Sequence, residues 1–134
     1  MDTNVERMQN RFYIKTDGSL FAFGFAEYGA LGVGETSQSN IPPTYVMTNV
    51  KKVKGNDYHS LILTRDGKLY SCGGGNCNYG YIGDGSMEKR DKPVFIMDGV
   101  RDFDISNFHS MVIKNDNSLW AFGLNNLNEN ELNL

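Results

Sequence analysis

The sequence predicts an all-β protein: a partial β-propeller of tandem four-stranded antiparallel blades, about 2.5 blades long and open unless other chains complete it. Three observations predict this fold. A hairpin pattern occurs three times, its turn residues Asp17, Asp66 and Asp116 lie 49 and 50 residues apart, and the flanking strands are almost continuously apolar. A fixed period of this length is typical of repeat architectures. Strands that are apolar on both faces are expected when each small sheet packs between two neighbours.

Each hairpin is predicted from its turn. Residues 12–24, 61–73 and 111–123 each contain an apolar strand, a turn and a second apolar strand. Asp-Gly in the first two turns predicts a two-residue type I′ turn, which requires positive φ at both positions. Asn117 replaces the glycine in the third turn, and asparagine is the next best residue at positive φ.

The remaining segments also recur. Residues 1–10 are polar and are expected to be a frayed lead-in. Residues 24–34 and 73–85 share the spacing Tyr-Gly-x-(Leu/Ile)-Gly-x-Gly, which indicates a copied loop, whereas no glycine follows Gly123. We therefore expect a single partial propeller over residues 1–134, with repeat copies at about 10–57, 58–107 and a truncated 108–134.

Composition narrows the function classes. The net charge is −3 and the two cysteines are too few for a disulfide framework. An acidic chain has no positive field for phosphate backbones, so no nucleic-acid partner is expected. No apolar stretch is long enough to span a membrane. The default expectation is a soluble cytoplasmic protein, with a nuclear location as the alternative if the source is eukaryotic.

Several residue groups suggest sites, and each is better explained structurally. His59 and His109 occupy one repeat position, which favours a repeated hydrogen bond within each blade over a metal pair or catalytic base. Cys72 aligns with core positions, and no second pair of ligands accompanies Cys72 and Cys77 for zinc. The glycine runs lack the lysine of a phosphate loop.

The charged groups are also interpreted as structural. The lysines and arginine of two small basic clusters are expected on a solvated strand edge or loop; they are Lys51, Lys52 and Lys54, and Lys89, Arg90 and Lys92. Five aspartates show no spacing typical of a convergent carboxylate site; they are Asp84, Asp91, Asp98, Asp102 and Asp104. No catalytic, cofactor-binding or metal-binding residue is assigned.

The repeat resembles that of the regulator of chromosome condensation family. The resemblance rests on His-Ser, three apolar residues, Thr-x-Asp-Gly-x-Leu-Tyr and a glycine at residues 59–73, and on Tyr-Gly-Tyr-Ile-Gly-Asp-Gly at 79–85. It covers about residues 10–123. The first copy departs from it with Asn10 in place of the histidine, and the third copy lacks the glycine loop.

The resemblance implies a closed seven-bladed propeller in complete family members, so about 2.5 blades would leave two open blade faces. The chain is then a fragment, a truncated relic or a chain that self-associates. The implied function is a non-catalytic protein-binding or scaffold module. The alternatives are guanine-nucleotide exchange on a small GTPase, and a self-assembling partial propeller.

A protein partner is expected, and a homo-oligomer is a further option. The binding residues are expected in the two loops that differ most between copies. These are Glu35, Thr36, Ser37, Gln38, Ser86, Met87, Glu88, Lys89 and Arg90.

Overall fold

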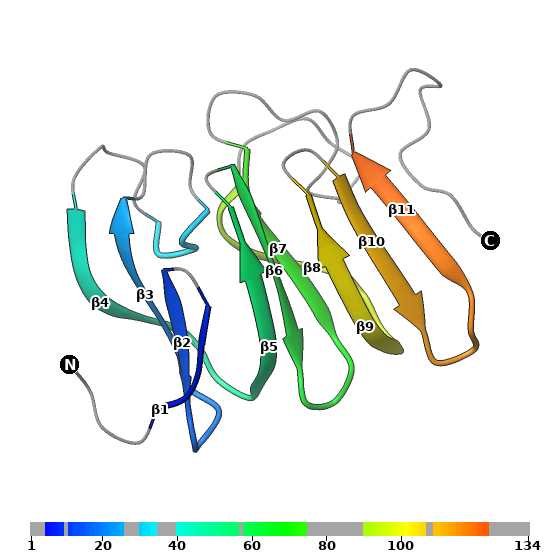
Figure 1. Cartoon of the computed structure of the whole chain (residues 1–134), viewed down its shortest axis with the longest axis horizontal. Helices are drawn as coiled ribbons and strands as arrows, with labels where there is room; N and C mark the ends of the chain where they lie inside the picture. Colours follow the sequence, from blue (N-terminus) through cyan, green and yellow to red (C-terminus); the bar gives the residue numbers. More distant parts are fainter. Residues whose placement is uncertain are drawn as a thin grey trace.

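The computed structural model describes residues 5–9, 11–25, 30–34, 40–56, 58–74, 90–106 and 109–123. These residues form strands grouped in three antiparallel sheets. Figure 1 shows the sheets side by side in chain order, from the N-terminal side to the C-terminal side. No helix long and apolar enough to cross a membrane occurs in these ranges. The all-β partial propeller predicted from the sequence is confirmed.

Consecutive strands are neighbours in every sheet. The first sheet contains β1 (Val5–Gln9), β2 (Phe12–Lys15), β3 (Leu20–Phe25) and β4 (Asn40–Met47). The second sheet contains β5 (Val50–Gly55), β6 (His59–Thr64), β7 (Leu69–Gly73) and β8 (Arg90–Met97). The third sheet contains, in the described part of the chain, β9 (Val100–Ile105), β10 (His109–Lys114) and β11 (Leu119–Gly123).

The predicted lead-in is wrong over Val5–Gln9. These residues form β1, which pairs with β2 through Met8 opposite Tyr13 and Gln9 opposite Phe12. A polar segment can form an edge strand because its backbone, not its side chains, makes the ladder of hydrogen bonds. Each sheet therefore begins one strand before the hairpin that dominates its sequence pattern.

The hairpin turns are in place, but their predicted type is wrong. The Gly18 N–H donates to the Lys15 carbonyl at 2.9 Å, and the Lys15 N–H donates to the Ser19 carbonyl at 2.9 Å. This is a three-residue connection in which only the last residue needs positive φ. Gly18, Gly67 and Asn117 have φ of 90°, 84° and 71°, whereas the preceding aspartates do not have positive φ.

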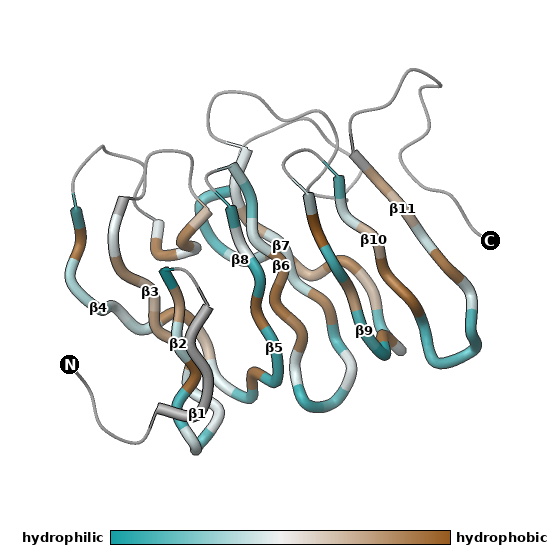
Figure 2. The backbone as a smooth tube through the Cα atoms, viewed as in Figure 1, coloured by the Kyte–Doolittle hydropathy of each residue, from teal (hydrophilic) through white to brown (hydrophobic). Residues whose placement is uncertain are grey.

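The core lies between the sheets. Strand β6 is buried along its whole length, as its continuous apolar pattern predicts. Strand β10 has the same kind of sequence, yet its residues alternate between exposed and buried at its start. Figure 2 shows apolar residues along the strands and hydrophilic residues at the hairpin ends. The difference between β6 and β10 arises because the second sheet lies between two others, while the third has the second on one side.

Candidate functional site: the outward face of the third sheet

The packing between the second and third sheets shows what one blade face presents to its neighbour. Leu61 and Leu63 on β6 and Leu69 on β7 face the third sheet and are buried. They pack in one cluster with Val100, Phe103, Val112 and Phe122. The first and second sheets are joined in the same way, through Phe12, Ile14 and Leu20 against Val50, Val53 and Ile62. Each interface therefore joins one face of a sheet to the opposite face of the next.

Two backbone hydrogen bonds recur at both interfaces. The Val50 N–H donates to the Gly18 carbonyl at 2.9 Å, and the Val100 N–H donates to the Gly67 carbonyl at 2.9 Å. Likewise, the Arg65 N–H donates to the Asn49 carbonyl at 2.9 Å, and the Asn115 N–H donates to the Gly99 carbonyl at 2.8 Å. The same geometric step thus relates each sheet to the next.

Charged residues line one side of the interface between the second and third sheets. Lys52 Nζ lies 2.5 Å from Asp102 Oδ1, and Lys54 Nζ lies 2.8 Å from Asp104 Oδ1. Hydrogen bonds from these lysines hold the pKa of each aspartate carboxyl below its usual value. Lys52 also donates to the Phe103 carbonyl at 2.7 Å, and its Nζ lies 4.6 Å from the centroid of the Phe103 ring.

These ion pairs correct the interpretation of Lys52 and Lys54 as merely solvated. Each lysine pairs with the aspartate 50 residues later, at the same repeat position of the next sheet. The signal was present in the sequence as a spacing equal to the repeat period. It was missed because the lysines and aspartates were considered as separate clusters.

The structural explanation of the histidines holds for His59, with one correction. His59 is fully buried, and its Nε2 lies 3.1 Å from Ser110 Oγ on β10. The hydrogen bond therefore joins neighbouring sheets and does not lie within one blade. Burial lowers the pKa of His59 to about 4, so the ring is neutral near pH 7. His109, the equivalent residue of the third sheet, is exposed.

Cys72 is a buried core residue, as predicted. Its Sγ lies 3.4 Å from the Ala30 carbonyl oxygen, and burial raises the pKa of its thiol to about 12. Cys77 lies outside the described residues. Within the described ranges, no three His, Cys, Asp or Glu side chains gather as metal ligands would.

The outward face of the third sheet repeats the composition of the buried face before it. We define this outward face as Met111, Ile113 and Leu119. Met111 lies opposite Asp104, and Ile113 lies between Asp102 and Leu119. Met111 is 44% exposed, whereas Leu61, its equivalent in the second sheet, is fully buried. An apolar surface of the kind that is buried elsewhere is thus open to solvent here.

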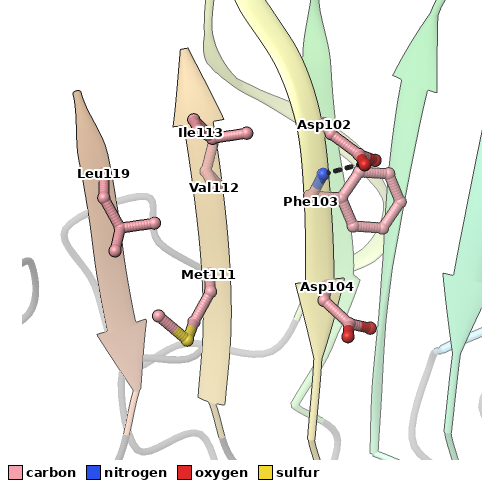
Figure 3. Close-up of a pocket in the computed structure, with 7 residues that line it drawn as sticks. All are labelled: Asp102, Phe103, Asp104, Met111, Val112, Ile113 and Leu119. Carbon is pink, nitrogen blue, oxygen red and sulfur yellow. Dashed lines mark hydrogen bonds between the residues drawn. The ribbon is translucent and has the colours of Figure 1, made fainter. Parts of the chain in front are cut away.

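A pocket lies on this face. It is lined by Asp102, Phe103, Asp104, Met111, Val112, Ile113 and Leu119. Figure 3 shows Met111 and Ile113 on β10 and Leu119 on β11, all on one side of β9. The Phe103 ring and the carboxylates of Asp102 and Asp104 lie on the other side of β9, toward the second sheet, where the aspartates pair with Lys52 and Lys54. The part of the pocket that faces away from the second sheet is therefore apolar.

Most of the predicted binding residues lie outside the part of the chain that the structure describes. Glu35, Thr36, Ser37, Gln38, Ser86, Met87, Glu88 and Lys89 lie outside the described residues. Arg90 is described and begins β8, where it lies opposite Gly73 of β7. The assignment of these nine residues to binding stays a prediction.

Comparisons with known proteins agree with the repeat pattern. A family model described as the regulator of chromosome condensation (RCC1) repeat matches residues 17–63, and a second model of the same description matches residues 50–78. Together these matches cover residues 17–78, so this part of the chain is similar to RCC1 repeats. The resemblance inferred from the sequence motifs is confirmed.

Among curated relatives, the chain is 36% identical over 75 residues to the X-linked retinitis pigmentosa GTPase regulator homolog of Caenorhabditis elegans. It is 32% identical over 76 residues to the ultraviolet-B receptor UVR8 of Arabidopsis thaliana. It is 31% identical over 72 residues to the guanine nucleotide exchange factor SRM1 of Saccharomyces cerevisiae. These matches cover 53%, 54% and 46% of this chain, and 5%, 17% and 14% of the respective relatives.

Solved structures of larger proteins share the fold. Prp20p of Saccharomyces cerevisiae, reported with its binding properties to Gsp1p and histones, has a TM-score of 0.70 at 20% identity. Human WBSCR16 has a TM-score of 0.69 at 19% identity. Each similarity covers 84% of this chain and 30% of the solved chain. The described sheets therefore have the arrangement of consecutive blades in these larger proteins.

Proposed function

We propose that this chain is a protein-binding module built of RCC1 repeats and that it performs no catalysis of its own. The observation that carries the proposal is the outward face of the third sheet. This face has the apolar composition of a buried blade interface, and its residue Met111 is 44% exposed. Exposed apolar patches are typical of protein interaction sites.

The relatives support a protein-interacting module. Prp20p is named for binding Gsp1p and histones, and another solved structure shows yeast RCC1 bound to Kap60. The chain spans 5–17% of the curated relatives described above, so their activities are not carried over whole. A cytoplasmic or nuclear location and the absence of a nucleic-acid partner are part of the proposal.

Photo-crosslinking from defined positions tests the binding proposal. A benzophenone amino acid replaces Met111 on the outward face, Ser86 in a predicted binding loop, or Phe95 on β8 as an exposed apolar control. We expect discrete crosslinked products from position 111, because that side chain lies in the face, and fewer from position 95. Equal diffuse labelling from all three positions would contradict a specific binding face. Strong products from position 86 alone would move the site to the predicted loops.

Guanine-nucleotide exchange is the second candidate, because two relatives are named exchange factors for this chemistry. The test is the release of a fluorescent guanine nucleotide from a Ras-type GTPase, with EDTA-induced release as the positive control. We expect the chain to leave the release rate unchanged. A release rate that rises with the concentration of the chain would overturn the non-catalytic proposal.

A further inference from the structure

We propose that the outward face of the third sheet binds the first sheet of a second copy of this chain, head to tail, in the geometry that joins the second sheet to the third. The inference rests on the proposed protein-binding function and names the partner at that face. Two observations carry it: the apolar faces that match by repeat position and the backbone groups at the hairpin ends.

The apolar faces match by repeat position. Met111, Ile113 and Leu119 correspond to Leu61, Leu63 and Leu69, which bury the inward face of the third sheet. The residues they bury are Phe103, Val112 and Phe122, with Trp120 packed beside them. The first sheet presents aromatic residues at the matching hairpin positions: Tyr13, Phe21 and Phe23.

These aromatic residues pack together on the first sheet. The Tyr13 and Phe21 rings are stacked with centroids 5.4 Å apart, and the Phe21 and Tyr45 rings meet edge-on at 6.0 Å. Tyr13 is buried, Phe21 and Phe23 are partly exposed, and Tyr45 is exposed like its equivalent Phe95 on β8. The partly exposed rings of Phe21 and Phe23 are the apolar groups that the first sheet offers on the side facing away from the second sheet.

The hairpin ends supply the same hydrogen-bonding groups. Gly18 and Gly67 each accept a hydrogen bond from the first residue of the next sheet, Val50 and Val100. Asn117 is the corresponding hairpin residue of the third sheet, and Val5 is the corresponding first residue of the first sheet. In the proposed contact, the Val5 N–H of the second copy donates to the Asn117 carbonyl.

Such a contact uses two different surfaces, so it is heterologous and propagates from copy to copy. A variant that disables one surface leaves the other intact. Met111→Glu disables the outward face of the third sheet by placing a charge in its apolar surface. Phe21→Glu disables the aromatic surface of the first sheet. Neither variant alone can form the contact with itself, but a mixture has one functional surface of each kind.

The test is molar mass in solution, measured by light scattering and sedimentation velocity across a concentration series. We expect the unmodified chain to exceed the monomer mass as its concentration rises. Met111→Glu and Phe21→Glu should each raise the dissociation constant about tenfold or more and remain monomeric. An equimolar mixture of the two variants should form a dimer and nothing larger. Phe95→Glu on β8 is the matched control and should associate like the unmodified chain.

Each outcome decides the proposal. A chain that is monomeric at all concentrations would overturn it, and so would a mixture of variants that stays monomeric while circular dichroism shows both to be folded. Association that Met111→Glu abolishes and Phe21→Glu leaves intact would indicate two identical faces in contact, which also overturns it. Crosslinks from position 111 to a different protein, with no self-association, would retain the protein-binding function and reject the second copy as partner.

Discussion

Lys52 and Asp102 stand at the same repeat position on neighbouring sheets, and Lys52 Nζ lies 2.5 Å from Asp102 Oδ1. The side chain of Lys52 is 21% exposed and that of Asp102 is 59% exposed. The aromatic ring and carbonyl of Phe103 also contact the lysine, so both electrostatic attraction and packing hold Lys52 against the third sheet. Equivalent positions of successive repeats thus carry different residues, here a lysine and an aspartate, and these residues bind one sheet to the next.

The first prediction concerns this pair. Lys52→Asp places two carboxylates together and should destabilise the fold by roughly 1 kcal/mol, because the aspartate is largely exposed and solvent screens the interaction. The double variant Lys52→Asp with Asp102→Lys should recover part of that loss. Urea unfolding of the four proteins in the double-mutant cycle measures the coupling. Equal stabilities for the single and double variants would show that the pair contributes only through packing.

The second prediction concerns pH. The folded-state pKa of His59 is about 4, against an ordinary value of 6.5. The unfolded chain therefore binds more protons between these values, so stability falls as pH is lowered from 6.5 to 4 and this contribution levels off below pH 4. The loss is on the order of 3 kcal/mol. Asp102 and Asp104, whose pKa values are lowered, lose their contributions only as pH falls below about 4.

Thermal melts from pH 7.5 to 4.5 measure this dependence. His59→Gln keeps a group able to hydrogen-bond Ser110 and removes the titration, so its melting temperature should change less over the same range. His109→Gln, at the exposed equivalent position, is the control and should follow the unmodified chain. A steep pH dependence that persists in His59→Gln would assign the effect to other groups.

The third prediction concerns backbone conformation at two glycines. A Cβ at Gly73, where φ is 124°, would lie 2.2 Å from the Tyr58 carbonyl oxygen and 2.6 Å from His59 Cα. Gly73→Ala should therefore destabilise the protein by about 3 kcal/mol or more, because the clash is with backbone atoms. Gly67→Asn should cost less than about 1 kcal/mol, because Asn117 adopts the same turn conformation in the third hairpin.

Denaturant unfolding compares the two variants directly. Asn117→Gly provides a reciprocal control and should be neutral or slightly stabilising, since glycine adopts positive φ without a Cβ contact. If Gly67→Asn proved as damaging as Gly73→Ala, the equivalence of the hairpin turns would be wrong.

The fourth prediction concerns thiol reactivity. Burial raises the pKa of Cys72 to about 12, and only the thiolate is a good nucleophile. In a Cys77→Ser background, Cys72 should react with a disulfide reagent at least about 100-fold more slowly in the native protein than in denaturant. Stopped-flow or spectrophotometric labelling measures both rates. Rapid native labelling would show that the space between the first and second sheets opens readily.

Much of the fold was predictable because it depends on local patterns repeated at a fixed spacing. Asp17, Asp66 and Asp116 located the hairpins, and the apolar strands indicated sheets packed between neighbours. The turn type was not predictable, because Asp-Gly suits both a two-residue turn and the three-residue connection that occurs here. Strand β1 was missed because Val5–Gln9 has a polar composition and pairs through its backbone.

The candidate site was only partly predictable. The residues on each face of a sheet depend on which side of each strand faces the next sheet. The pairs of Lys52 with Asp102 and Lys54 with Asp104 could have been found by comparing residues one period apart. The binding loops chosen from sequence variation lie mostly outside the described residues, so they stay a prediction.

The amino-acid sequence alone determined the repeat, the hairpins and the resemblance to RCC1 repeats, because each follows from residues close together in the chain or at a constant period. Tertiary structure decided which apolar residues are core and which are surface. Leu61 and Met111 occupy the same repeat position, yet the former is fully buried and the latter is 44% exposed. Both side chains are apolar and are stabilised by burial. Leu61 is buried because the third sheet packs against it, whereas no described sheet packs against Met111.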